Sequence, residues 1–140
     1  MAKDQYVAYV GTYTNGTSRG IHIYDVDVDE GLLYLRRVMP IRNSSYIMAS
    51  NDGKYLYSLA DEGVMIFSVL EDGDLKPVNK IRMDGMRGHQ MARDRREAYI
   101  YVAGYHDGKV TMIRTQEDGR LGRQTYGTFH KGTGGINQRG

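Results

Sequence analysis

The sequence predicts an all-β protein, and three observations support that fold class. Twelve Tyr and eighteen Gly among 140 residues favour strands joined by tight turns, because aromatic side chains suit pleated sheets and Gly accepts positive φ. Apolar and polar residues alternate in short runs, which is the period of a β-strand. The same arrangement of strands and turns then recurs with a period of about 43 residues.

Two sets of glycines mark the repeat. One set lies in turns of similar sequence, DEGLL, EDGDL and EDGRL: Gly31, Gly73 and Gly119. These glycines are 42 and 46 residues apart. The other set opens an alternating apolar run: Gly20, Gly63 and Gly108. They are 43 and 45 residues apart, so two independent landmarks give one period.

The elements can be assigned in order along three segments. Residues 6–40 contain the Tyr-rich run YVAYVGTYT, the run GIHIYDV and a last strand that ends near Pro40. Residues 45–83 begin with an additional short strand, SYIMAS, followed by KYLYSLADE, GVMIFSV and a final strand. Residues 89–128 repeat this order with HQMA, AYIYVAGYHD, GKVTMIR and a final strand. Asp-Gly and Glu-Gly turns between the runs reverse the chain as in hairpins.

Four strands in about 43 residues is the period of a β-propeller blade. The sequence therefore predicts a partial β-propeller of about two and three-quarter four-stranded blades, the first segment lacking its innermost strand. We expect one incomplete domain over residues 1–140, with residues 129–140 as a tail. Closed propellers have about four to eight blades, so we expect either a portion of a longer protein or a chain completed by self-association.

Blades at either end of an open array should expose an apolar sheet face. We expect apolar rows such as Ile47 with Leu56, or Ile100 with Val102, to be exposed there and to drive self-association through these blade faces.

Composition excludes several classes of function. A net charge of +2, with acidic and basic residues interspersed, argues against a nucleic-acid partner. The absence of Cys excludes a disulfide framework, a Cys-based zinc site and a thiol nucleophile. The first residues form no apolar run of the length of a signal peptide or membrane span, so we expect a cytoplasmic protein with no membrane partner.

In such a meander, the loops between second and third strands and the connections between blades lie on one side of the disc. Side chains suited to catalysis gather there, and we predict these as catalytic: His106, His89 and Glu62. A further group could hold an anionic substrate: Arg42, Asn43, Arg87, Tyr13 and Lys131. A neutral imidazole near a carboxylate such as Asp61 can activate water, since its pKa lies near working pH. For each single residue, a loop hydrogen bond or a solvated charge is the alternative.

Two other roles for the histidines are not predicted. His22 falls inside the run GIHIY, and we expect an ordinary strand residue there. No two His residues have the close spacing of a ligand pair, so we predict no metal site.

The segments YVGTYTNGTSRGIHIYDVD, SSYIMASNDGKYLYSLADEGVMIFSV and VAGYHDGKVTMIRTQEDGRLG resemble the N-terminal part of the lactonase family of seven-bladed β-propellers, which includes 6-phosphogluconolactonases. The resemblance implies a seven-bladed architecture and hydrolysis of 6-phosphoglucono-1,5-lactone to 6-phosphogluconate in the pentose phosphate pathway, without a metal or organic cofactor. The partner implied is a small, phosphorylated sugar lactone. Two alternatives stay open, a lactonase for another cyclic ester and a non-catalytic propeller that serves as a binding or scaffold module.

This chain departs from the family pattern in four places. Asn43 is followed by Ser-Ser where the family commonly has Pro-Ser, and His106 is preceded by Gly-Tyr where the family has Asn-Tyr. The family's inner-strand His falls at either His89 or Gln90. A later Pro-His-x-His segment of the family lies beyond Gly140, so we expect this chain alone to lack part of the site.

Overall fold

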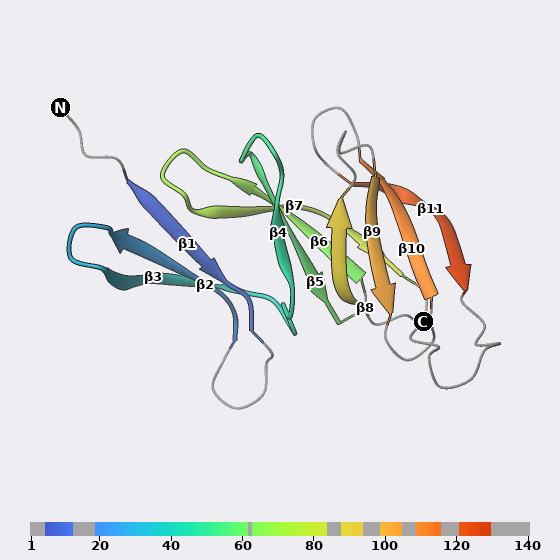
Figure 1. The fold of residues 1–140 in the computed structure, drawn as a ribbon, viewed down its shortest axis with the longest axis horizontal. Coiled ribbons are helices and arrows are strands. Elements are labelled where there is room, and N and C mark those ends of the chain that lie inside the picture. Colours follow the sequence, from blue (N-terminus) through green and yellow to red (C-terminus); the bar gives the residue numbers. More distant parts are fainter. Residues whose placement is uncertain are drawn as a thin grey trace.

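The computed structural model describes residues 5–12, 19–61, 63–83, 88–93, 99–104, 109–115 and 121–129. These residues form strands joined by turns, and the strands assemble into three antiparallel sheets that follow one another along the chain (Figure 1). The predicted all-β fold is confirmed. Among the described residues, no helix is long and apolar enough to cross a membrane.

The first sheet has three strands, β1 (Tyr6–Val10), β2 (Gly20–Asp27) and β3 (Leu32–Pro40), in that spatial order. The turn between β2 and β3 closes with Gly31 at a φ of 67°. The Asp27 carboxylate accepts backbone N–H groups of the two residues at positions 29 and 30, so the acidic turn satisfies its own donors.

The second sheet has four strands in sequence order: β4 (Ile47–Ala49), β5 (Tyr55–Ala60), β6 (Gly63–Val69) and β7 (Leu75–Arg82). The sheet is a meander in which every strand pairs with the strand before it.

The third sheet repeats this plan with β8 (Gly88–Arg93), β9 (Tyr99–Gly104), β10 (Lys109–Thr115) and β11 (Leu121–Phe129). Two complete four-stranded blades and one three-stranded blade are therefore present, as the repeat predicted.

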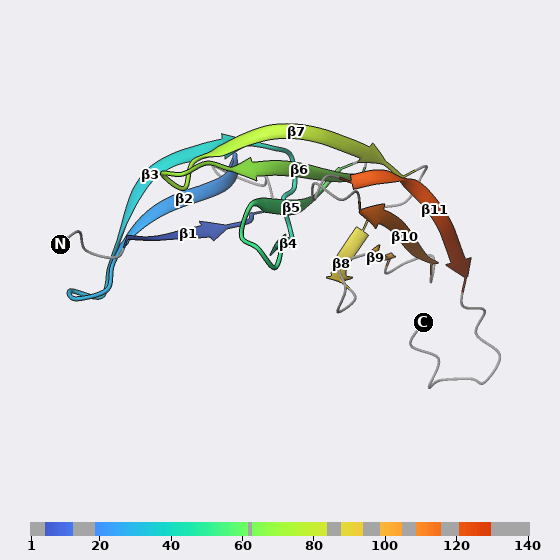
Figure 2. The same cartoon turned by 90° about the horizontal axis from the view of Figure 1, so that it is seen from above.

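The three sheets fan around a common side (Figure 2). The last strands β3, β7 and β11 follow the outer, convex side of the array, while β1, β4 and β8 lie on its inner side. This is the arrangement of consecutive propeller blades, and among the described residues the first blade has no innermost strand.

Two apolar layers hold the blades together. The layer between the first and second sheets contains these fully or nearly buried side chains: Ile21, Ile23, Met39, Ile41, Leu56, Phe67 and Leu75. The layer between the second and third sheets contains another set: Tyr57, Leu59, Val64, Ile66, Met83, Met91, Ile100, Val102 and Ile113. Burial of one such aliphatic or aromatic side chain contributes about 1.5–3 kcal/mol, so these layers supply most of the stability.

The expectation that Leu56, Ile100 and Val102 would be exposed is wrong. Each is at most 3% exposed, and Ile47 is half-buried against the first layer. These residues lie on faces that pack against a neighbouring blade. The sequence did not predict this, because the alternation in these strands gives two apolar faces and does not indicate which one meets the neighbour. The outward face of the first sheet carries a different set: Tyr6, Val10, Leu33 and Leu35, which are 43–55% exposed.

Candidate functional site

Strand register brings the ends of many strands to one edge of the three sheets. The residue pairs that define this edge are Val10 with His22, Gly20 with Pro40, Ala60 with Gly63, Gly88 with Gly104, and Lys109 with Phe129. We call it the mouth edge. The tips of β1, β5, β9 and β11 point toward it at the lower side of Figure 1.

Three of the predicted site residues fall within the described part of the chain. Arg42 and Asn43 lie on the connection between β3 and β4, at the mouth edge. The backbone of His89 lies in β8, where the register shifts between Gly88 and Gln90, so His89 is the extra residue of a β-bulge. The remaining predicted residues lie outside the described residues: Tyr13, Glu62, Arg87, His106 and Lys131.

Arg42 and Asn43 meet Asp61, the first residue after β5. The Arg42 Nε atom lies 3.2 Å from the Asp61 Oδ2 atom. The Asn43 side-chain amide donates a hydrogen bond to the other carboxylate oxygen, Oδ1, at 2.5 Å. We call these three residues the Asp61 cluster. It joins a connection between blades to the β5–β6 turn, as the predicted gathering of loops at one mouth requires.

The backbone under the cluster is held by a buried hydroxyl. Ser44 is fully buried, and its Oγ atom accepts the Thr12 N–H at 3.1 Å and donates to the Thr12 carbonyl at 3.3 Å. The Thr12 hydroxyl in turn donates to the Gly20 carbonyl at 2.7 Å. A Cβ at Gly11 would lie 2.2 Å from the Ser44 carbonyl oxygen, so only Gly permits this approach.

Asn43 adopts a left-handed backbone conformation with a φ of 55°. Asn tolerates this region better than most residues, and the Ser45 N–H donates to the Asn43 carbonyl at 2.8 Å across the turn. The conformation bends the connection at the point where the amide side chain contacts Asp61.

The cluster presents a cationic group at its surface. Arg42 has 84% of its side chain exposed, whereas Asp61 has 31% exposed. The exposed guanidinium can donate to a phosphate or carboxylate, and the Asn43 amide adds a neutral donor beside it. Within the part of the chain that the structure describes, no group of three or more His, Asp or Glu side chains is placed to hold a metal ion.

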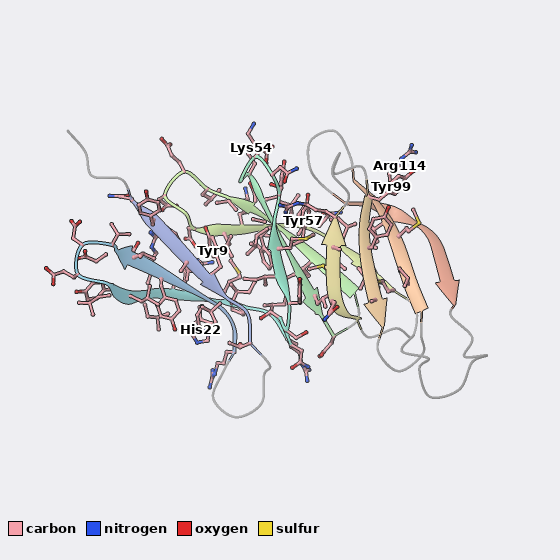
Figure 3. All side chains as sticks on the ribbon, in the orientation of Figure 1. Tyr9, His22, Lys54, Tyr57, Tyr99 and Arg114 are labelled. Atoms are coloured by element: carbon pink, nitrogen blue, oxygen red, sulfur yellow. The ribbon has the colours of Figure 1, made fainter. Side chains whose placement is uncertain are left out.

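His22 is part of a strand, as predicted. It lies in β2, its ring is stacked on Tyr24 with centroids 6.2 Å apart, and its Nδ1 atom lies 3.3 Å from the Gly20 carbonyl oxygen. Figure 3 shows His22 on the first sheet.

The edge opposite the mouth carries the Asp-Gly turns. Lys54 marks it at the top of Figure 3. Gly53 and Gly73 both have positive φ, which confirms the tight turns predicted from the sequence. The Asp52 carboxylate accepts the Lys54 N–H at 2.9 Å and the Ser50 hydroxyl at 2.8 Å, and these hydrogen bonds hold the pKa of Asp52 below its usual value. The Asp52 side chain thus accepts hydrogen bonds from donors of its own turn.

Sequence reasoning missed the parts played by Ser44 and Asp61. Asp61 was one of several charged residues assigned to the mouth, and nothing in its spacing distinguished it from Glu62. Ser44 carries no charge and no periodic signal. Its position directly after an Asn in a short connection was the available clue, because Asn and Ser there form local side-chain hydrogen bonds.

Comparison with known proteins gives a consistent result. Residues 7–140 match the family model described as "Lactonase, 7-bladed beta-propeller". A 6-phosphogluconolactonase of Bacillus subtilis is 29% identical over 136 residues, which cover 93% of this chain and 39% of that protein. A 6-phosphogluconolactonase of Formosa agariphila is 28% identical over 124 residues, with coverage of 81% and 35%.

Solved structures share the fold. A Bacteroides fragilis protein, provisionally assigned as a 6-phosphogluconolactonase, superposes with a TM-score of 0.83 at 27% identity, covering 96% of this chain and 39% of its own. The periplasmic gluconolactonase of Pseudomonas aeruginosa superposes with a TM-score of 0.82 at 23% identity, covering 91% and 39%, and supports the fold alone. The chain spans about two fifths of the length of these relatives. With three consecutive blades and a family match over nearly its whole length, the chain belongs to the seven-bladed β-propeller lactonase family.

Proposed function

We propose that the protein hydrolyses a sugar lactone, 6-phosphoglucono-1,5-lactone, to 6-phosphogluconate. The observation that carries the proposal is the family match over residues 7–140, together with relatives named 6-phosphogluconolactonase. The exposed guanidinium at the mouth edge supports it, because the substrate carries a phosphate.

The reaction adds water to the lactone carbonyl and opens the ring. A base removes one proton from the attacking water as its oxygen bonds to the carbonyl carbon. The tetrahedral oxyanion is stabilised by hydrogen-bond donors, and it collapses as the bond to the ring oxygen breaks. The ring oxygen takes up a proton, and the product acid releases one at neutral pH.

We assign the base to His106 or His89, with Glu62 as a supporting carboxylate. Arg42, Asn43, Arg87, Tyr13 and Lys131 are assigned to substrate binding. The chemistry needs no metal or organic cofactor. A cytoplasmic location accompanies the proposal, since a phosphorylated sugar does not cross an apolar bilayer unaided.

Proton release in weakly buffered solution, monitored with a pH indicator, tests the proposal. The protein should accelerate proton release from 6-phosphoglucono-1,5-lactone above the spontaneous rate. His106→Ala should remove about a hundredfold or more of that acceleration if this histidine is the base. Asp74→Asn, at a turn on the opposite edge, is the matched control and should hydrolyse at the wild-type rate. A wild-type rate equal to the spontaneous rate overturns the proposal.

A further inference from the structure

The Asp61 carboxylate contacts two residues of the connection between β3 and β4. Its Oδ2 atom contacts the Arg42 Nε atom at 3.2 Å, and its Oδ1 atom accepts the Asn43 amide. Resting on the proposed function above, we propose that Asp61 is a positioning residue, which orients the Arg42 guanidinium to receive the phosphate group of the substrate.

The contact through Nε determines which part of the guanidinium remains for a ligand. The group is planar and carries five N–H donors in a fixed fork. Because Asp61 contacts the Nε atom, the edge formed by Nη1 and Nη2 is the part of the group that remains for a ligand. Two parallel N–H donors on one edge match two oxygens of a phosphate. The 84% exposed Arg42 side chain leaves that edge accessible.

Buried residues and a defined turn support the cluster. Asp61 directly follows Ala60, which is buried and ends β5. The Arg42 connection is fixed by the left-handed Asn43 backbone and by the buried Ser44 hydroxyl. A carboxylate mounted on one blade therefore restrains a guanidinium mounted on the connection from the preceding blade. Such support for a binding group limits the side-chain entropy that is lost when the ligand binds.

The ion pair between Arg42 and Asp61 is expected to contribute little to the free energy of unfolding. Exposed pairs contribute about 0–1 kcal/mol, because water screens them and two long side chains must be ordered. Asp61→Asn keeps the shape of the side chain and an oxygen that can accept the Asn43 amide. The variant should therefore fold with a nearly unchanged melting temperature, and any change in ligand binding reports on the site.

Positioning and charge masking have opposite signs, and this makes the test decisive. If Asp61 only neutralises Arg42, its removal raises the local positive potential and strengthens anion binding. If Asp61 positions Arg42, its removal weakens binding of the phosphate and leaves the rest of the ligand unaffected.

Isothermal titration with 6-phosphogluconate and with gluconate measures the contribution of the phosphate as the ratio of the two affinities. We expect wild type to prefer 6-phosphogluconate, and Asp61→Asn to lower the ratio by about fivefold. Arg42→Lys should lower it similarly, because an ammonium is a point charge that cannot form the two-pronged contact. The matched control is Asp74→Asn, which removes the partner of Arg37 at 3.3 Å and should leave the ratio unchanged.

Three results would overturn the inference. These are a higher affinity of Asp61→Asn for 6-phosphogluconate, an affinity ratio unchanged from wild type, and a wild-type protein without preference for the phosphorylated ligand. Failure of the proposed function is separable from these outcomes. Hydrolysis of unphosphorylated glucono-1,5-lactone without phosphate preference would retain the lactonase and reject the role of Asp61, whereas phosphate-selective binding without hydrolysis would do the reverse.

Discussion

Gly63 opens β6 at a point where a side chain has no room. A Cβ built there would lie 1.9 Å from the Ile81 carbonyl oxygen of β7, and that backbone atom cannot move without breaking the sheet. We predict that Gly63→Ala lowers the free energy of unfolding by at least about 2 kcal/mol, measured by urea denaturation.

Gly53 provides the control for this prediction. Its φ is 73°, but a Cβ added there would meet no atom within 4 Å, so Gly53→Ala should cost only the left-handed strain of about 1–2 kcal/mol. A loss for Gly63→Ala that is no greater than the loss for Gly53→Ala would contradict the steric account.

Asp52 should make stability depend on pH in the acid range. The Lys54 N–H and the Ser50 hydroxyl lower the pKa of this carboxyl from its ordinary value of 3.8 in the folded state. Because the folded pKa is depressed, the stabilisation is present above pH 3.8 and is lost as the pH falls through the folded pKa. We predict that Asp52→Asn melts below wild type at pH 7, and that the difference in melting temperature closes as the pH falls below 3.8. A difference that stays constant over this range would contradict the assignment.

At the residue scale, the sequence predicted on which edge a residue lies better than it predicted which side chains pair. The meander rule placed Arg42, Asn43 and Asp61 at one edge, and the turn residues predicted the positive φ of Gly31 and Gly53. The pairing of Asp61 with Arg42 and Asn43 was not predictable, because it depends on the left-handed turn at Asn43 and on side-chain geometry, and neither leaves a periodic signal in the sequence.

At the element scale, side chains of the first sheet donate hydrogen bonds to the hairpin turn between β6 and β7. We call this contact the clasp. The Tyr9 hydroxyl of β1 donates to the Gly73 carbonyl at 2.5 Å, and the Arg36 guanidinium of β3 donates to the Asp72 carbonyl at 2.7 Å. Burial raises the pKa of Tyr9, consistent with a hydroxyl that stays protonated and donates. Figure 3 shows Tyr9 on the first sheet, from which it reaches the turn of the second.

We predict that Tyr9→Phe lowers the free energy of unfolding by about 0.5–1.5 kcal/mol, the usual net value of a hydrogen bond. Amide hydrogen exchange should also accelerate at residues 72–74. Tyr34→Phe is the matched control, since the Tyr34 side chain on β3 is exposed and its substitution should be nearly neutral. Equal stabilities of the two variants would show that the clasp contributes nothing measurable.

The order of the strands was predictable, whereas the direction in which each blade faces was not. Tyr-rich runs and Gly-led runs identified the strands of each blade, because period-2 alternation and Gly turns are local signals. The face that meets a neighbour depends on packing between sheets, and in the middle blade both faces are apolar. For that reason Leu56 was expected on the surface and is found 3% exposed between blades.

On the scale of the whole molecule, the outward face of the first sheet carries exposed apolar side chains, among them Leu33 and Leu35. We predict that the protein associates with a second copy through this face, and that Leu33→Thr with Leu35→Thr reduces the weight-average mass in sedimentation equilibrium. Leu70→Thr, at an exposed turn position elsewhere, is the control and should not change the mass. A wild-type protein that stays monomeric at every concentration would refute this prediction.

The arrangement of the blades places at one edge residues that are distant from one another along the chain. The proposed chemistry depends on this arrangement, because the candidate bases His89 and His106 lie on other segments of the chain than Arg42. The strand registers and the Asp61 cluster support this arrangement for the first two blades. The repeat predicts that the turn containing His106 lies at the same edge.

Amide NMR of the isotope-labelled chain, titrated with 6-phosphogluconate, tests this arrangement most directly. We predict that shift changes concentrate in residues 41–45, 60–63 and 104–109, while residues 51–54 and 70–74 on the opposite edge stay unchanged. Changes confined to the opposite edge, or spread evenly over all the turns, would contradict a shared mouth.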